Sequence, residues 1–218
     1  MSRIPSQTRR SSQELELETP HGPARAHVFV PEGEPRGVLA LGHGAGGSVE
    51  APDLLATRDV ALSLGCAAVL VEQPYRAAGR KSAAPAKQLD VAWEAVMSQL
   101  PTELREVPLV CGGRSSGARV ACRTAGAVGA VAVLCLAFPL HPPRRNPDAE
   151  LKTRLPELEG AGVPVLVVQG VSDRFGVPAS DEALDRVVVE IRGDHGLKSD
   201  KAALVAAVGG WLPRFLSA

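Results

Sequence analysis

The sequence predicts an α/β fold in which helices cover both faces of a mainly parallel central sheet. Short apolar runs alternate along the chain with longer, helix-forming segments, and this alternation is typical of βα units. Several of the runs, such as residues 37–42, are apolar at successive positions, as expected for strands buried on both faces. Neither an internal repeat nor a change in composition divides the chain. We therefore expect one domain over residues 13–218, preceded by a polar, disordered tail over residues 1–12.

Composition excludes several classes of function. The 218 residues are 45% hydrophobic and 22% charged, which is ordinary for a globular domain, and the formal net charge is zero. A neutral chain with 3% aromatic residues has neither the charge nor the stacking groups expected of a nucleic-acid or membrane-surface partner. We also expect a cytoplasmic protein, since residues 1–14 lack the apolar stretch of a secretory signal and no later run has the length of a membrane span.

The four cysteines predict core positions and no metal site. They are not arranged as a C-x-x-C pair, and three of them lie in apolar, strand-like runs, where a free thiol packs as a small hydrophobic group. We predict neither a metal nor another cofactor. The four are Cys66, Cys111, Cys122 and Cys135.

The first half of the chain predicts an antiparallel opening followed by parallel strands. Alternating apolar residues on either side of a turn at 19–23 predict two paired strands. A central strand over 37–42 then ends in a glycine-dense loop. A helix over 52–64, a buried strand over 66–71, a polar loop to residue 81 and a helix over 86–100 follow.

The second half keeps the same alternation. A strand ending near residue 112 leads through a glycine turn into a helix that ends near residue 125, and strands are expected over 130–137, 164–169 and 186–191. Short helices are expected over 149–158 and 182–185, and a terminal helix over 198–215. The connection from 138 to 162 is too short for a large lid domain.

One motif, Gly113-x-Ser115-x-Gly117, carries the strongest chemical signal. It lies between a buried strand and a helix, as a nucleophile elbow does, where a sharp turn presents one serine hydroxyl above the sheet. By itself the motif fits a simple glycine turn equally well, so its meaning depends on the rest of the chain.

The ends of later strands supply that context. In a parallel sheet, ligands bind beyond the carboxyl ends of the strands, and Asp173 and His195 follow two such strands. Imidazole can take the serine proton near neutral pH, and a carboxylate can fix its tautomer. Alone, Asp173 fits a turn or helix cap, His195 fits an exposed loop, and Glu72 is either a substitute acid or a solvated side chain. Together, Ser115, Asp173 and His195 predict a nucleophile, acid and base.

Other residues at these strand ends are candidates for binding the substrate. The N–H groups of Ala45 and Ser116, with Gly44 as second choice for the former, are candidates for the oxyanion hole. Arg114 faces either a pocket or solvent, and Arg144 either binds an anionic substrate or is solvated. His43, in the glycine loop, either binds substrate or has a structural role. The substrate-binding candidates are His43, Arg114, Phe138 and Arg144.

Five segments at the strand ends carry a resemblance to a known family: residues 42–46, 112–117, 138–143, 169–176 and 193–195. Together they resemble α/β-hydrolases, in particular the small, lid-poor branch with dienelactone-hydrolase-like and testis-expressed-protein-like hydrolases. This resemblance covers residues from about 15 to the end and implies the α/β-hydrolase fold with Ser115, Asp173 and His195 as the triad. Dienelactone hydrolases use cysteine where this chain has Ser115.

We therefore expect a serine hydrolase that cleaves an ester or thioester of a small molecule through an acyl-enzyme. A non-catalytic interaction module on the same fold, or a peptidase or lactonase, remains an alternative at this point. The acyl group, the leaving group and the oligomeric state are left open by the sequence.

Overall fold

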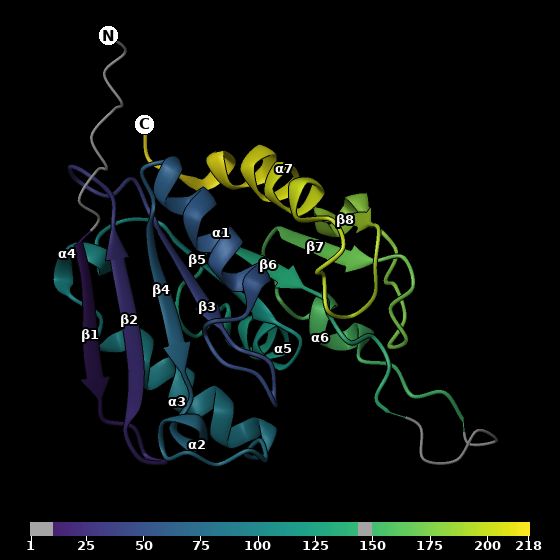
Figure 1. Cartoon of the computed structure of the whole chain (residues 1–218), viewed down its shortest axis with the longest axis horizontal. Helices are drawn as coiled ribbons and strands as arrows, with labels where there is room; N and C mark the ends of the chain where they lie inside the picture. The colour runs from purple at the N-terminus through teal and green to yellow at the C-terminus, as the bar shows by residue number, and fades with distance from the viewer. Residues whose placement is uncertain (1–10, 144–149) are drawn as a thin grey trace, which may run out of the picture.

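The structure is a computed structural model, and it describes residues 11–143 and 150–218. Within these residues, eight strands form one sheet in the order β1-β2-β4-β3-β5-β6-β7-β8 (Figure 1). The pairs β1–β2 and β2–β4 are antiparallel, and every later pair is parallel. The strands are β1 (Ser11–Leu17), β2 (Ala24–Val30), β3 (Val38–Gly42), β4 (Ala67–Glu72), β5 (Leu109–Arg114), β6 (Ala132–Leu136), β7 (Val165–Gly170) and β8 (Arg186–Ile191).

The predicted fold class is confirmed: the sheet is mainly parallel with antiparallel N-terminal strands, helices cover both of its faces, and the described residues contain no large lid. The helices are α1 (Pro52–Ser63), α2 (Pro74–Ala77), α3 (Ala86–Ser98), α4 (Thr102–Arg105), α5 (Ser116–Thr124), α6 (Leu155–Glu159) and α7 (Lys201–Trp211), with 3₁₀ turns η1 (Glu182–Leu184) and η2 (Leu212–Phe215). No helix in the described ranges is long and apolar enough to cross a membrane.

Several element boundaries differ from those predicted. The strand β1 begins at Ser11, inside the predicted tail, because its backbone pairs with β2 as far as Val30; residues 1–10 of that tail lie outside the described ranges. The terminal helix begins at Lys201 because the Asp200 side chain caps it, accepting from the Ala203 N–H at 3.1 Å. The polar loop after β4 contains the short helix α2, which begins at Pro74.

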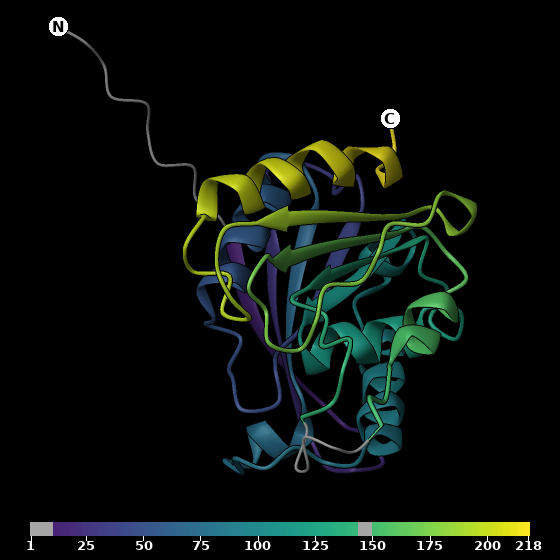
Figure 2. The same cartoon turned by 90° about the vertical axis from the view of Figure 1, so that its right-hand side faces the viewer.

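Side chains of the central strands alternate between two hydrophobic cores. In β3, Val38 and Ala40 belong to one core while Leu39 and Leu41 belong to the other. The helices α3, α5 and α6 cover the first face, and α1 and α7 pack together on the second; Figure 2 shows α7 and α5 on opposite sides of the sheet. The sheet is therefore the middle layer of three.

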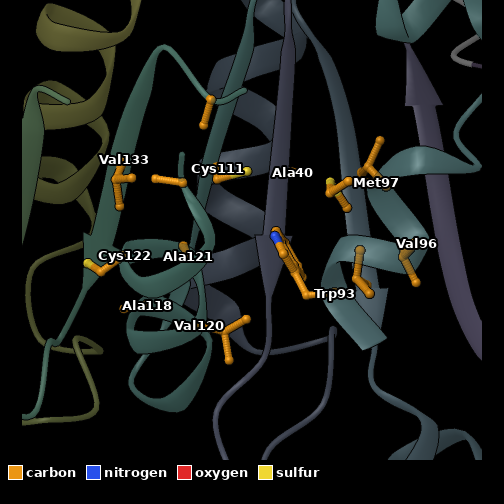
Figure 3. Close-up of a cluster of buried hydrophobic side chains, with 14 of the residues drawn as sticks. Ala40, Trp93, Val96, Met97, Cys111, Ala118, Val120, Ala121, Cys122 and Val133 are labelled. Carbon is orange, nitrogen blue, oxygen red and sulfur yellow. The ribbon is translucent and has the colours of Figure 1, made fainter. Parts of the chain in front are cut away.

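The core under α3 and α5 holds α5 against the sheet. Trp93 on α3 is fully buried and lies beside Ala40 of β3, while Val120 and Ala121 come from α5 (Figure 3). Small residues on α5 let its backbone approach β5 and β6 closely. This packing fixes the turn between β5 and α5, which carries Ser115.

Candidate active site

Ser115 occupies a strained turn between β5 and α5. Its φ of 53° and ψ of −105° lie outside the regions that a side chain favours, and its N–H is held by Leu136 O of β6 at 2.9 Å. Glycine is required on either side of the serine. A Cβ at Gly113 would lie 2.5 Å from Gly42 O, and one at Gly117 would overlap the same oxygen. The strained backbone of this turn thus directs the Ser115 hydroxyl out of the sheet.

The structure brings Ser115, His195 and Asp173 together. His195 Nε2 lies 3.0 Å from Ser115 Oγ, and His195 Nδ1 lies 2.7 Å from Asp173 Oδ2. An ionised carboxylate only accepts hydrogen bonds, so it favours the imidazole tautomer that carries its proton on Nδ1. Nε2 is then free to accept the serine proton, which is the arrangement that a general base needs.

Neighbours on the β7 loop fix the acid. The Asp173 side chain is fully buried, and its Oδ1 accepts from the Phe175 N–H at 2.9 Å while its Oδ2 also accepts from Gln169 Nε2 at 2.7 Å. The Phe175 ring stands edge-on to the His195 ring, with centroids 4.6 Å apart. Hydrogen bonds therefore hold the carboxylate, and an aromatic contact holds the imidazole.

The loops after β7 and β8 must pass very close to each other to bring Asp173 and His195 together. A Cβ at Gly170, the last residue of β7, would overlap the backbone oxygen of Asp194. The Asp194 carboxylate turns into its own loop and accepts from the Gly196 N–H at 2.8 Å. Asp194 therefore serves the loop, and Asp173 is the carboxylate that reaches the imidazole.

A cavity of about 280 Å³ opens beside the hydroxyl. Ala45, Ser115 and Ser116 share its wall, whereas Gly44 does not line it. The Ser116 N–H is the first of α5, where an intrahelical acceptor is lacking, so it is available to a developing oxyanion. The loop position of Ala45 is held by Tyr75, whose hydroxyl donates to Ala45 O at 2.8 Å. This geometry favours Ala45 over Gly44 as the partner of Ser116.

His43 stabilises the loop that carries Gly44 and Ala45, and it does not line the cavity. Its Nε2 accepts from the Gln73 N–H at 3.1 Å, which requires the proton to sit on Nδ1, and Nδ1 donates to Gly44 O at 2.8 Å. Burial lowers the pKa of His43, so the neutral form that makes both bonds is stabilised. Of its two predicted roles, the geometry gives it the structural one.

Comparison with known proteins identifies the family. The model of the alpha/beta hydrolase domain matches residues 35–206, which is most of the chain. The chain belongs to the alpha/beta hydrolase family. A search of curated proteins finds no match.

Solved structures agree with this hydrolase in fold. XC6422 from Xanthomonas campestris, described as a serine hydrolase without a lid, superposes with a TM-score of 0.72 at 20% identity, covering 99% of this chain and 98% of that one. Est1E from Butyrivibrio proteoclasticus gives 0.73 at 15% identity, covering 94% and 98%. A dienelactone hydrolase from Anabaena variabilis gives 0.73 at 16% identity, covering 96% and 100%.

In this hydrolase, Arg114 does not line the cavity and instead holds the loop that carries His195. Its guanidinium donates to His195 O at 2.8 Å and pairs with Asp53 Oδ2 at 3.0 Å. Burial raises the pKa of Asp53, and the charge of Arg114 opposes that rise. Arg114 thereby ties the loop that carries His195 to the first turn of α1.

The remaining predicted residues are not brought to the cavity. Phe138 is fully buried in the core under α5, and only its carbonyl takes part in the site, accepting from Gln169 at 3.0 Å. Arg144 lies outside the described residues. Glu72 faces Arg25 and His27 of β2, at 3.8 and 4.0 Å, so it does not act as a substitute acid.

Sequence reasoning missed the residues that support the site from other elements. Asp53 and Arg154 lie in no recognised motif, and only their place at helix starts could have drawn attention to them. Gln169 opens the segment 169–176 that resembles α/β-hydrolases, but no role was predicted for it. Within residues 11–143 and 150–218, His, Cys, Asp and Glu side chains do not gather into a set that could hold a metal ion.

Proposed function

We propose that this hydrolase cleaves carboxylic esters or thioesters by a serine mechanism, with Ser115 as nucleophile, His195 as base and Asp173 as orienting acid. The observation that carries the proposal is the continuous chain of contacts from Ser115 Oγ through His195 to Asp173, at 3.0 and 2.7 Å. The family membership supports a hydrolase, and the esterases among the structural neighbours are consistent with ester substrates.

The reaction follows from the roles of these groups. Ser115 Oγ attacks the carbonyl carbon as its proton moves to His195 Nε2, and the N–H groups of Ser116 and Ala45 stabilise the oxyanion. The imidazolium then protonates the leaving alcohol or thiol. Water, deprotonated by His195, attacks the acyl-enzyme and releases the carboxylic acid. The strained elbow keeps the hydroxyl in place throughout, since backbone packing and not substrate binding fixes it.

A fluorophosphonate probe tests the nucleophile directly. We expect stoichiometric labelling of the wild type, with the adduct mapped to Ser115 and not to the neighbouring hydroxyl of Ser116. Ser115→Ala should abolish labelling and lower ester hydrolysis by at least about a thousandfold. Ser98→Ala, which removes an exposed hydroxyl of α3, serves as the control and should label normally.

Three outcomes would contradict the proposal in whole or in part. A folded wild type that is not labelled and cleaves neither esters nor thioesters would favour an interaction module on the hydrolase fold. Undiminished hydrolysis by Ser115→Ala would place the chemistry elsewhere. Cleavage of amides or lactones in preference to acyclic esters would keep the nucleophile but change the substrate class.

A further inference from the structure

The cavity beside Ser115 has a basic wall. Three arginines line it together with the apolar side chains of Leu89, Pro139 and Phe175. Two of them come from α5, directly behind the nucleophile, and the third precedes α6. They are Arg119, Arg123 and Arg154. The positive charge of this wall needs carboxylates, from the protein or from a ligand, to balance it.

The two arginines on α5 are paired. Arg119 binds Glu157 of α6 with both arms of its guanidinium, at 2.8 and 2.6 Å. Arg123 binds Asp90 of α3 in the same way, at 2.9 and 2.6 Å, and reaches Glu157 at 3.0 Å. These contacts satisfy both carboxylates with bidentate pairs.

Arg154 is different. Its Nη1 donates to Pro139 O at 3.0 Å and to His141 O at 3.4 Å, and within residues 11–143 and 150–218 it forms no ion pair with a carboxylate. Partial burial and the charges of Arg119 and Arg123 lower the pKa of Arg154, and the charge of Glu157 opposes this only in part, although a guanidinium stays protonated at neutral pH. Among the described residues, three guanidinium groups thus face two carboxylates at the cavity wall, and Arg154 is the one that is not paired with a carboxylate.

The location of the cavity indicates which part of a substrate would meet this charge. Ser115 and the two amides proposed for the oxyanion hole line the cavity, but His195, which must protonate the leaving group, does not. The leaving group therefore departs on the other side of the hydroxyl, and the acyl chain enters the cavity. At about 280 Å³ the cavity has room for a short chain only.

We propose that the substrate is a short acyl ester or thioester with a second, free carboxylate at the far end of its acyl chain, which Arg154 binds. A guanidinium suits a carboxylate because its planar donors match the two oxygens, and the anion would neutralise the unpaired charge of the wall. This inference rests on the proposed function. Ser115 Oγ forms a bond to the ester carbon, the bond to the leaving oxygen or sulfur breaks with protonation by His195, and water then releases the dicarboxylate.

The test compares two esters of equal chain length. Monomethyl glutarate and methyl pentanoate differ only in the terminal carboxylate, so the ratio of their kcat/KM values, followed in a pH-stat, measures recognition of the charge. We expect the wild type to favour the glutarate ester by at least about tenfold, and Arg154→Met to lower that ratio at least about tenfold. Arg105→Met removes an arginine that also lacks a carboxylate partner among the described residues, at the opposite end of β5, and should leave the ratio unchanged.

A second pair of substrates separates the acyl side from the leaving side. If 4-acetoxybenzoate is favoured over phenyl acetate while the glutarate ester is not favoured, the carboxylate belongs to the leaving group and the proposal is overturned. Equal use of the two methyl esters by the wild type, or an unchanged ratio in Arg154→Met, also overturns it. Either result leaves the proposed function standing, because esters are still cleaved.

Glutarate binding tests the proposal where the comparison of the two esters cannot be made. If Arg154→Met does not fold, glutarate is tested as a competitive inhibitor of methyl pentanoate hydrolysis by the wild type; inhibition supports the proposal and its absence overturns it. If the wild type cleaves no ester at all, the proposed function fails, and glutarate is tested for a rise in the melting temperature. A rise that Arg105→Met keeps and Arg154→Met loses supports an anion site at Arg154, while the lack of a rise, or a rise that Arg154→Met keeps, overturns it.

Discussion

At the scale of single residues, Gln169 connects the proposed acid to the chain around it. It is fully buried, and its Nε2 donates to Asp173 Oδ2 at 2.7 Å, to Phe138 O at 3.0 Å and to Gly176 O at 3.1 Å. One amide group therefore fixes the carboxylate relative to the ends of β6 and β7. Asp173 can orient His195 only if it is itself held, so Gln169 is a positioning residue.

Gln169→Leu should separate positioning from binding. The carboxylate loses a donor and gains freedom to rotate, and small displacements of reacting groups cost up to about a hundredfold in rate. We expect kcat to fall about 10- to 100-fold with little change in KM, and fluorophosphonate labelling to slow in parallel. Gln99→Leu removes an exposed amide that also donates to two backbone carbonyls, and serves as the control. A fall in melting temperature without a change in kcat would show that Gln169 is only structural.

The residues that sequence predicted best are those whose chemistry needs a specific place on the chain. Ser115 was recognisable because its turn requires glycines on both sides, and Asp173 and His195 because each follows a strand. Arg114 was not assignable, since the middle position of the elbow motif accepts many side chains and the partners of Arg114 come from other loops. Contacts between distant segments leave no local pattern, and Arg154 was missed for the same reason. Gln169 lies in the segment 169–176, but an amide at the end of a buried strand does not by itself indicate which groups it binds.

At the scale of elements, ion pairs link three helices on one face of the sheet. Glu157 joins α6 to Arg119 and Arg123 of α5, and Asp90 joins α3 to the same helix. Burial alone would raise the pKa of Glu157, but the bonds and charges of the two arginines outweigh it and lower the pKa below its usual 4.5. The short helix α6, only Leu155–Glu159, depends on this link for its position.

The lowered pKa gives this link a pH dependence of known sign. A carboxyl group whose pKa is depressed on folding contributes stability above its unfolded value and loses it as the pH falls through the folded value. Glu157→Gln should therefore lower the free energy of unfolding by about 1–3 kcal/mol at pH 7, measured by urea denaturation. The difference from the wild type should shrink below about pH 4.5.

Another glutamate on the same helix provides the control. Glu159 is exposed, and Glu159→Gln should change the free energy of unfolding by less than about 0.5 kcal/mol at either pH. A pH-independent loss in Glu157→Gln would contradict the electrostatic account and assign the effect to packing.

Element boundaries were less predictable than element types. Buried strands were recognised because they are apolar at successive positions, and the helices α1 and α3 because Gly65 and Pro101 follow them closely. The helix α2 was missed, since it is a single turn whose buried residues Pro74 and Tyr75 follow no period. The start of α7 was misplaced because its cap, Asp200, is one of several polar residues in that loop.

At the scale of the whole molecule, the topology of the sheet assembles the site. The strands β5, β7 and β8 run parallel, so their carboxyl ends meet one edge of the sheet, and the loops after them carry Ser115, Asp173 and His195. The two hydrophobic cores on either side fix these strands against one another. The site therefore exists only while both cores are intact, which makes opening of the whole domain the relevant motion for its loss.

The rate at which the four cysteine thiols are modified measures the opening of the whole domain. All are free and buried, and burial raises the pKa of the Cys66 and Cys111 thiols from 9.0 to about 12. Only the thiolate reacts with a disulfide reagent, and at pH 8 the raised pKa lowers the thiolate fraction of these two thiols about a thousandfold. They should therefore be modified at least about a thousandfold more slowly in the native protein than in urea, and the limited access of the reagent to buried thiols slows the reaction further. We expect the modification rate to follow the free energy of unfolding across urea concentrations. Fast modification of one thiol under native conditions would instead show that its segment opens locally, independently of the two cores.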